Sequence, residues 1–190
     1  MTYKIPLPPT PVLETERLIL RPLEARDTPA IQRIFSQWEV VKHLHASVPW
    51  PYPDDGAATN MAQCLDDRAK GLKFYWSITV RGSDELRGRI DLAAFDPERR
   101  DGRGFWLDPL LHGQGLMTEA ADAVTDYAFR TLAYPWLYLT NSTANTASGR
   151  IKEKQGAERA YVEPRQYVSG PGEAQVWRLT REAWLARRAG

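Results

Sequence analysis

The residues best suited to chemistry form a glycine-spaced stretch that runs through His112, Gly113, Gln114, Gly115, Leu116, Met117, Thr118, Glu119 and Ala120. This stretch leads from an apolar strand pattern directly into a long, alanine-rich helix pattern. Glycines allow the main chain to approach an anion closely, and the unpaired N–H groups of a helix's first turn point at such a ligand. The same spacing also occurs in ordinary strand-to-helix turns. The surrounding sequence therefore decides whether the stretch is a pyrophosphate site.

A second polar cluster stands at the start of a later helix pattern and contains Asn145 and Ser148. Asn145 suits the N-cap position and Ser148 falls in the first turn, so capping alone would explain both residues. Side chains of a first turn can also face a bound ligand, and the two roles are compatible. Lys154 and Gly156 close the same helix pattern.

Hydrophobic periodicity predicts the elements that position these two clusters. Strands are expected at 17–22, 73–81, 85–95, 103–108, 136–140, 157–163 and 174–180. Helices are expected from Asp27 or Thr28, from Asp54 or Asp55 to Gly71, from about Thr118 to Leu132, and from Asn145 to Gly156. The tightly joined early strands must be antiparallel, and helices separate the later ones. The pattern indicates an α+β fold around one mixed sheet flanked by helices.

The start of the chain differs from the rest. Residues 1–13 contain Pro6, Pro8, Pro9 and Pro11, which fix the φ angle and remove backbone donors. We expect an extended, proline-rich arm over 1–13 and one domain over 14–190. A chain of 190 residues with 43% hydrophobic content is sufficient for a single core.

Charge and cysteine content exclude several classes of protein. Lys plus Arg number 25 and Asp plus Glu number 24, so no basic field favours nucleic acid. The single cysteine, Cys64, allows no internal disulfide, and no spacing of a metal cluster is present. A secretion signal and a membrane-length apolar run are also missing. We expect a cytoplasmic protein that binds no metal, nucleic acid or membrane, and whether it forms a homodimer is left open.

Two long runs carry a resemblance to a known superfamily. Residues 102–129, GRGFWLDPLLHGQGLMTEAADAVTDYAF, resemble the acetyl-CoA-binding core of the GNAT acetyltransferases. Residues 141–160, NSTANTASGRIKEKQGAERA, resemble the helix that follows that core. Three further segments are similar to the RimJ/RimL-like branch of ribosomal-protein N-acetyltransferases: LETERLILRPLEARD, VVKHLHASVPWPYPDDGA and KFYWSITV. The resemblance covers about Leu13 to Leu179.

The resemblance implies a GNAT-like fold in which a bulged strand splays the sheet and the pantetheine of acetyl-CoA lies in the gap. The main chain at Trp106 and Leu107 would bind the pantetheine amides. The pyrophosphate would be held by His112, Gly113, Gln114, Gly115, Met117 and Thr118. Asn145, Ser148 and Lys154 would complete the cofactor site.

Three positions depart from the residues usual in the superfamily. His112 stands where Arg or Gln is usual, and Met117 stands where Gly or Ala is usual. Many members carry a tyrosine seven residues after the Asn of the second motif, where it protonates the departing thiolate, but here that residue is Lys152. The resemblance implies that Ser148, beside Asn145, donates the hydrogen bond to the sulfur instead.

Acyl transfer from a thioester to an amine requires a neutral amine, a stabilised carbonyl oxygen and a proton for the thiolate. The backbone N–H of Leu107 is a candidate donor to the carbonyl oxygen. A lysine amine with a pKa of about 10.4 costs roughly 4.6 kcal/mol to be neutral at pH 7, whereas an α-amine costs about 1–1.4 kcal/mol. An α-amine acceptor therefore manages with a weak base.

Candidates for that base are Asp91, which interrupts an apolar run, and the histidines His43 and His45. Asp91 would equally suit the solvent face of a strand, because carboxylates are usually exposed. Contact with the acceptor is predicted for Asp91 and for the aromatic residues Trp50, Tyr52 and Trp76. Core packing is the alternative for the aromatic residues.

The sequence therefore predicts an N-acetyltransferase that acetylates a primary amine, on a protein N-terminus or a small molecule, by direct attack in a ternary complex. The alternative is a non-catalytic acyl-CoA-binding sensor on the same fold, which Met117 and the missing tyrosine favour. A dinucleotide-binding domain is disfavoured, because the glycine turn follows a hairpin region and lacks the G-x-G-x-x-G spacing.

Overall fold

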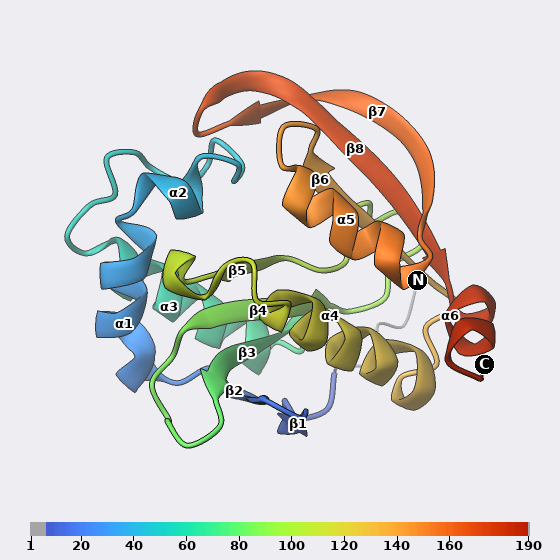
Figure 1. Cartoon of the computed structure of the whole chain (residues 1–190). Helices are drawn as coiled ribbons and strands as arrows, with labels where there is room; N and C mark the ends of the chain where they lie inside the picture. Colours follow the sequence, from blue (N-terminus) through green and yellow to red (C-terminus); the bar gives the residue numbers. More distant parts are fainter. Residues whose placement is uncertain (1–6, 190) are drawn as a thin grey trace.

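Two antiparallel sheets form the centre of the computed structural model, which describes residues 7–189 (Figure 1). The first sheet has the strand order β1-β2-β3-β4-β5, formed by Leu13–Glu14, Leu18–Pro22, Lys73–Val80, Gly88–Ala93 and Phe105–Leu107. The second sheet has the order β6-β8-β7, formed by Trp136–Ser142, Gly170–Thr180 and Glu158–Tyr167. The chain thus completes one sheet before it begins the other.

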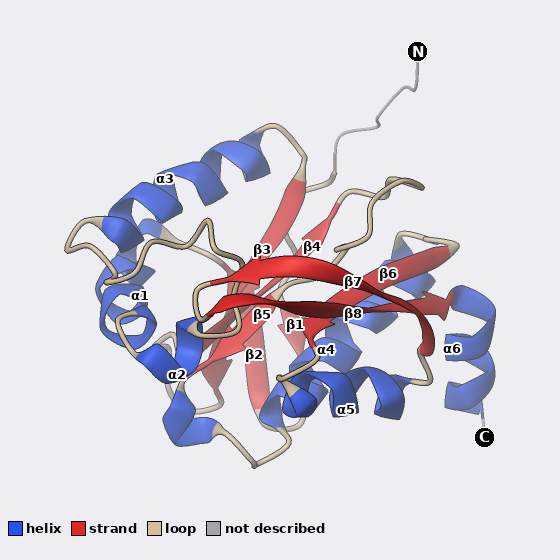
Figure 2. Ribbon diagram, turned by 90° about the horizontal axis from the view of Figure 1, so that it is seen from above, coloured by secondary structure: helices blue, strands red, loops and turns tan. Residues whose placement is uncertain are grey.

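Helices cover the first sheet on both faces (Figures 1 and 2). One face carries α1 (Thr28–Phe35), α2 (Trp38–Val41) and α3 (Gly56–Ala69), and the other carries α4 (Leu116–Asp126). A π-helical segment, Tyr127–Thr131, extends α4. α5 (Thr146–Gln155) packs against α4 and β6, and α6 (Arg181–Ala189) packs against β8. Short 3-10 turns at Ala25–Asp27 and Pro109–Leu111 precede α1 and the glycine turn.

Strand β3 explains why both faces are covered. Its side chains alternate between the faces, so Phe74, Trp76 and Ile78 join the core under α4. Tyr75, between them, joins the separate core under α1, α2 and α3. β3 is buried on both faces and is the third of the five strands in its sheet.

The two sheets meet at one backbone contact and then separate. Gly102 N donates to Tyr138 O of β6 at 2.8 Å, just before the chain enters β5. From Phe105 onward, β5 pairs with β4 and with no other strand of the described chain. The edge of β5 that faces away from β4 is therefore left without a strand partner.

These observations confirm the α+β fold, the antiparallel N-terminal strands and the flanking helices. The predicted single mixed sheet resolves into two sheets, and every strand pair among the described residues is antiparallel. The reason is that β5 is only three residues long and diverges from β6 before a parallel ladder is established.

The proline-rich arm is described only from residue 7 onward, and residues 1–6 lie outside the described chain. Leu7 packs against the core under α4, and Pro11 O accepts a 2.7 Å hydrogen bond from Trp76 Nε1. The described part of the arm therefore packs on its own chain. The boundary between an arm over 1–13 and a domain over 14–190 stays a prediction.

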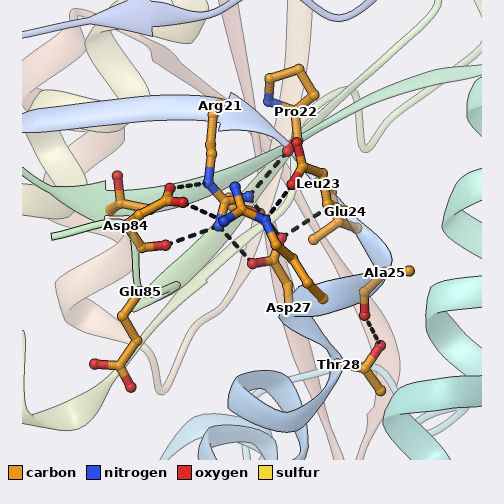
Figure 3. A network of polar contacts seen from close by, with 12 residues as sticks. Arg21, Pro22, Leu23, Glu24, Ala25, Asp27, Thr28, Asp84 and Glu85 are labelled. Carbon is orange, nitrogen blue, oxygen red and sulfur yellow. Dashed lines mark hydrogen bonds and ion pairs between the residues drawn. The ribbon is translucent and has the colours of Figure 1, made fainter.

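A buried polar network fixes the position of α1 (Figure 3). Arg21 of β2 donates from Nη1 and Nη2 to the two carboxylate oxygens of Asp27, at 2.9 and 2.7 Å. Ser77 of β3 donates to Asp27 at 2.6 Å, and Arg21 Nε donates to Asp84 in the β3–β4 hairpin at 2.6 Å. Burial would raise the pKa of Asp27, but the bonds from Arg21 and Ser77 outweigh it and lower that pKa. The network joins β2, β3, the hairpin and the start of α1.

Candidate active site

A cavity of about 360 Å³ lies where β5, α2 and the first turns of α4 and α5 converge. It is lined by Glu39, Val40, His43, Leu44, Phe105, Trp106, Leu107, Leu111, His112, Gly113, Gly115, Leu116, Met117, Thr118, Asn145, Ala147, Ser148, Arg150, Ile151 and Lys154. The two polar clusters of the sequence, which are about 30 residues apart in the chain, thus meet in one space. Of the predicted cofactor-binding residues, only Gln114 does not line it.

The glycine turn has the backbone of an anion site. Gly113 and Gly115 adopt φ angles of 76° and 78°, in the left-handed region that favours glycine. The first backbone bond into α4 runs from Glu119 N to Gly115 O at 3.1 Å. Within the described chain, no protein oxygen accepts from the amides of 113–118. These N–H groups, at the positive end of the helix dipole, remain available to an anion.

The N-terminal strands hold this turn in place. The Glu119 carboxylate accepts from Thr15 Oγ1 at 2.5 Å, from Arg17 N at 2.8 Å and from Arg17 Nε at 2.7 Å. Arg17 Nη1 also donates to Gln114 O at 3.0 Å. The Gln114 amide donates to Leu110 O at 3.2 Å, which directs this side chain away from the cavity. Glu119, although it does not line the cavity, therefore anchors the turn.

Positive charge is concentrated near the glycine turn. Arg150 and Lys154, both on α5, line the cavity together with the first turn of α4. Two cations and a helix N-terminus suit a ligand that carries several phosphate charges. The Met117 side chain packs largely into the core under α4, so it adds less bulk beside the glycines than its type suggests.

Strand β5 presents its free edge to the cavity. Asp91 N donates to Gly104 O at 2.8 Å and Asp108 N donates to Arg87 O at 2.7 Å. Because pairing residues alternate along an antiparallel ladder, the main-chain groups of Phe105 and Leu107 point away from β4. The His112 Nε2 lies 3.0 Å from Leu107 O, which requires the tautomer with a proton on Nε2. The carbonyl of Leu107 is thus held by His112, and its N–H lies along the same free edge.

The first turn of α5 forms the facing wall. Asn145 Oδ1 accepts from Ser148 N at 3.1 Å, which is the predicted N-cap bond. Both residues also line the cavity, so capping and ligand contact coexist geometrically. The Ser148 hydroxyl in turn lies 2.8 Å from the Nζ atom of Lys152.

Helix α2 also lines the cavity. It and the turn after it contribute Glu39, Val40, His43 and Leu44. Burial, and then the charge of Lys42, lowers the pKa of His43, although Glu39 opposes this. His43 is therefore neutral at pH 7 and able to accept a proton.

The residues predicted to contact the acceptor do not line this cavity. The prediction for Trp76 is wrong, because this residue is buried in the core, whereas those for Trp50, Tyr52 and Asp91 stay predictions. Trp76 is fully buried under α4 with its indole N–H bonded to the arm. Trp50 is 40% exposed and packs against Trp38, and Tyr52 packs against Phe35.

Asp91 and His45, two candidate bases, are also placed elsewhere. Asp91 accepts from Gly104 N at 3.2 Å and lies 3.6 Å from Lys73 Nζ. His45 Nδ1 accepts from Ser47 N at 3.1 Å. Neither residue lines the cavity, so the geometry favours His43 among the three candidates.

Helix α2, which lines part of the cavity, is not predicted by the sequence. The sequence predicts one helix from Asp27 or Thr28, whereas in the structure α1 ends at Phe35 and a separate helix, α2, begins at Trp38. A four-residue helix has too few residues to show a period, so its facing side chains leave no pattern. The sequence signal that indicates this helix is the pair Glu39 and His43, an acidic and a basic side chain four residues apart.

The described residues show neither a metal site nor a membrane span. No three His, Cys, Asp or Glu side chains among them gather in a way that could hold a metal ion. None of the described helices is long and apolar enough to cross a bilayer. Cys64 is buried, which raises the pKa of its thiol, and it does not line the cavity.

A family model described as an acetyltransferase (GNAT) domain matches residues 17–158. The chain therefore belongs to the GNAT acetyltransferase family, whose members use acetyl-CoA. It is 30% identical over 159 residues to the uncharacterized N-acetyltransferase YoaA of Bacillus subtilis, covering 83% of this chain and 88% of that one. The family and this relative identify the chain as an acetyltransferase.

Two solved structures show the same fold. RimL, a ribosomal L7/L12 alpha-N-protein acetyltransferase in complex with coenzyme A, superposes with a TM-score of 0.76 at 17% identity, over 91% of this chain and 99% of that one. RimJ of Mycobacterium smegmatis, in complex with a CoA-disulfide, gives a TM-score of 0.75 at 16% identity, over 98% and 96%. The predicted likeness to the RimJ/RimL-like branch is thus matched at the level of the fold.

Proposed function

We propose that this acetyltransferase transfers the acetyl group of acetyl-CoA to a primary α-amine by direct attack in a ternary complex. The observation that carries the proposal is the single cavity, which joins free helix amides, a free strand edge and the α2 wall. A donor with phosphates at one end and a thioester at the other can span it. The acceptor then approaches from the α2 side.

The chain's own groups divide the work of donor binding. The amides of 113–118, with Arg150 and Lys154, bind the phosphates. The free edge of β5 offers main-chain groups to the pantetheine amides, and the N–H of Leu107 stabilises negative charge on the carbonyl oxygen. Ser148, from the facing wall, donates to the sulfur. Asn145 positions Ser148 by accepting from its backbone.

His43 is the base in this proposal. Among the three candidates it alone lines the cavity, and its lowered pKa keeps the imidazole neutral at pH 7. It accepts the proton that the attacking nitrogen loses. A neutral imidazole suffices for an α-amine, because deprotonating such an amine at pH 7 costs only about 1–1.4 kcal/mol. The relative named RimL acts on a protein α-amine, which supports a peptide N-terminus as the acceptor class.

The test is steady-state acetylation of a peptide library with free N-termini, alongside N-capped lysine peptides and small amines. We expect transfer to free N-termini and intersecting double-reciprocal plots. Parallel plots would contradict direct attack, because they indicate a covalent enzyme intermediate. Tight acetyl-CoA binding without transfer to any amine would favour the sensor instead.

A further inference from the structure

Lys152 is a buried lysine directly behind the reacting wall of the cavity. Its side chain is only 2% exposed and does not line the cavity. Nζ donates to Ser148 O at 3.2 Å and to Ser148 Oγ at 2.8 Å, one turn earlier on α5. The ring of Phe105, from the free edge of β5, lies 5.2 Å from the same Nζ. Among the residues that line the cavity, Ser148 is thus the hydrogen-bond partner of Lys152.

The surroundings of Lys152 disfavour the charged form of its amine. No carboxylate forms an ion pair with Lys152 in the described chain. The charged neighbour that acts on it is Arg103, which is 4% exposed and bonded to Gln155 Oε1 at 2.9 Å and to Thr125 Oγ1. Asp122 and Asp91 act on Arg103 rather than on Lys152.

Burial and then the charge of Arg103 lower the pKa of Lys152 well below its ordinary value. Packing alone does not explain a lysine here, because an apolar side chain would fill the same space without losing hydration. A role in proton transfer would explain why a lysine occupies this position.

We propose that Lys152 supplies, through Ser148, the proton that the departing thiolate takes up. This inference rests on the proposed function in placing Ser148 beside the thioester sulfur. Lys152 touches Ser148 rather than the substrate, so it is a positioning residue that also holds the proton.

The proton and electron movements balance. The acceptor nitrogen forms a bond to the carbonyl carbon, the carbon–sulfur bond breaks, and its electron pair stays on sulfur. The Ser148 hydroxyl proton passes to sulfur while the Lys152 ammonium passes a proton to Ser148 Oγ. The attacking nitrogen loses its proton to His43. After product release, Lys152 regains a proton from solvent through Ser148, and His43 loses its proton to solvent.

Acid strength supports this sequence. An ordinary lysine ammonium, with a pKa of about 10.4, is a weaker acid than a thiol with a pKa of about 8.5. Because its pKa is lowered, the Lys152 ammonium is a stronger acid than an ordinary lysine ammonium.

The experiment compares kcat against pH for the wild type and for the variants K152M, K152R and K152Y, with K70M as the control on an exposed lysine. K152M should lower kcat by about 10²-fold, the usual size of general acid catalysis, and should remove the decline of kcat at high pH. K152Y should restore part of the rate because a phenol can release its proton. K152R should not, because a guanidinium keeps its charge but is not deprotonated in proteins.

Three results would overturn the proposal. A wild-type kcat and an unchanged high-pH decline in K152M would show that no proton comes from Lys152. Equal rescue by K152R and K152Y would show that charge alone matters, and a change confined to KM would show a role in binding. If circular dichroism shows that K152M does not fold, the comparison of kcat between K152R and K152Y tests the proposal instead.

S148A separates this inference from the proposed function. If S148A keeps the wild-type kcat, Ser148 is not beside the sulfur, and both the donor assignment and the Lys152 relay fail. If S148A lowers kcat while K152M does not, only the relay fails.

Discussion

The glycine turn is where one residue changes donor affinity most selectively. Gly113 has a φ angle of 76°, and a Cβ built there would meet no other atom within 4 Å. Gly113→Asp should raise the KM for acetyl-CoA by at least about 10-fold, since a carboxylate beside the phosphates costs upwards of 1.4 kcal/mol at close range. Gly113→Asn is the matched control, because asparagine tolerates the same φ without the charge. Equal KM values in steady-state kinetics for the two variants would contradict the phosphate assignment.

Lys152 also makes a prediction about stability. Its folded pKa lies below the unfolded value of about 10.4, so the unfolded state binds more protons between these two values, and stability rises with pH across that window. The penalty is fully present below the folded pKa and disappears above about 10.4. Lys152→Met should therefore raise Tm at pH 7 and raise it less toward pH 10. Calorimetry across this range checks it, and a gain that is independent of pH would contradict the titration of Lys152.

At the scale of single residues, nearly all the positions predicted to bind the donor line the cavity, whereas those predicted to contact the acceptor do not. Gly113, Gly115, Asn145 and Ser148 lie in or beside turns whose geometry is local, so their types and spacing specify their positions. Trp76 could not be placed in the same way, since the face of a strand on which a side chain lies depends on register with distant strands.

The secondary-structure elements show the same division between local and long-range information. The helix at Asn145 and Gly156 was predicted to within a residue of its bounds, because an N-cap and a glycine stop are local signals. The two-residue β1 and the four-residue α2 were not predicted, since neither is long enough to show a period. The division of the strands into two sheets depends on where β5 leaves β6, which no local pattern encodes.

The link between β2 and α1 carries a prediction at this scale. Removing one member of a buried ion pair leaves the other without a partner, so Arg21→Met should lower the free energy of unfolding by about 3–5 kcal/mol. It should also lower kcat/KM for the acceptor, because α1 leads directly into the α2 wall. Urea denaturation and acetylation kinetics measure the two effects. Lys70→Met, on an exposed pair with Asp66, should leave stability nearly unchanged.

The whole molecule should respond to its donor as one cooperative unit. A ligand at 100 times its Kd stabilises the folded state by about 2.7 kcal/mol, which corresponds to a Tm rise of roughly 5–10 °C for a chain of this size. Coenzyme A should produce such a shift, and added salt should reduce it because phosphate charges are involved. Pantetheine at the same concentration should produce little shift. An equal shift with pantetheine would place the binding energy in the strand edge rather than in the glycine turn.

The carboxylate of Glu119 ties the glycine turn at 113–118 to Thr15 and Arg17, which precede it by about a hundred positions in the chain. A truncation that removes the chain up to and including Arg17 should therefore weaken the anchoring of the glycine turn, although it leaves the residues of the turn unchanged. Lowering the pH should weaken the same anchoring in the full-length protein. Burial raises the pKa of Glu119, but the bonds from Thr15 and Arg17 outweigh it and lower that pKa, so the tether holds near neutrality and is released as acidification protonates the carboxylate.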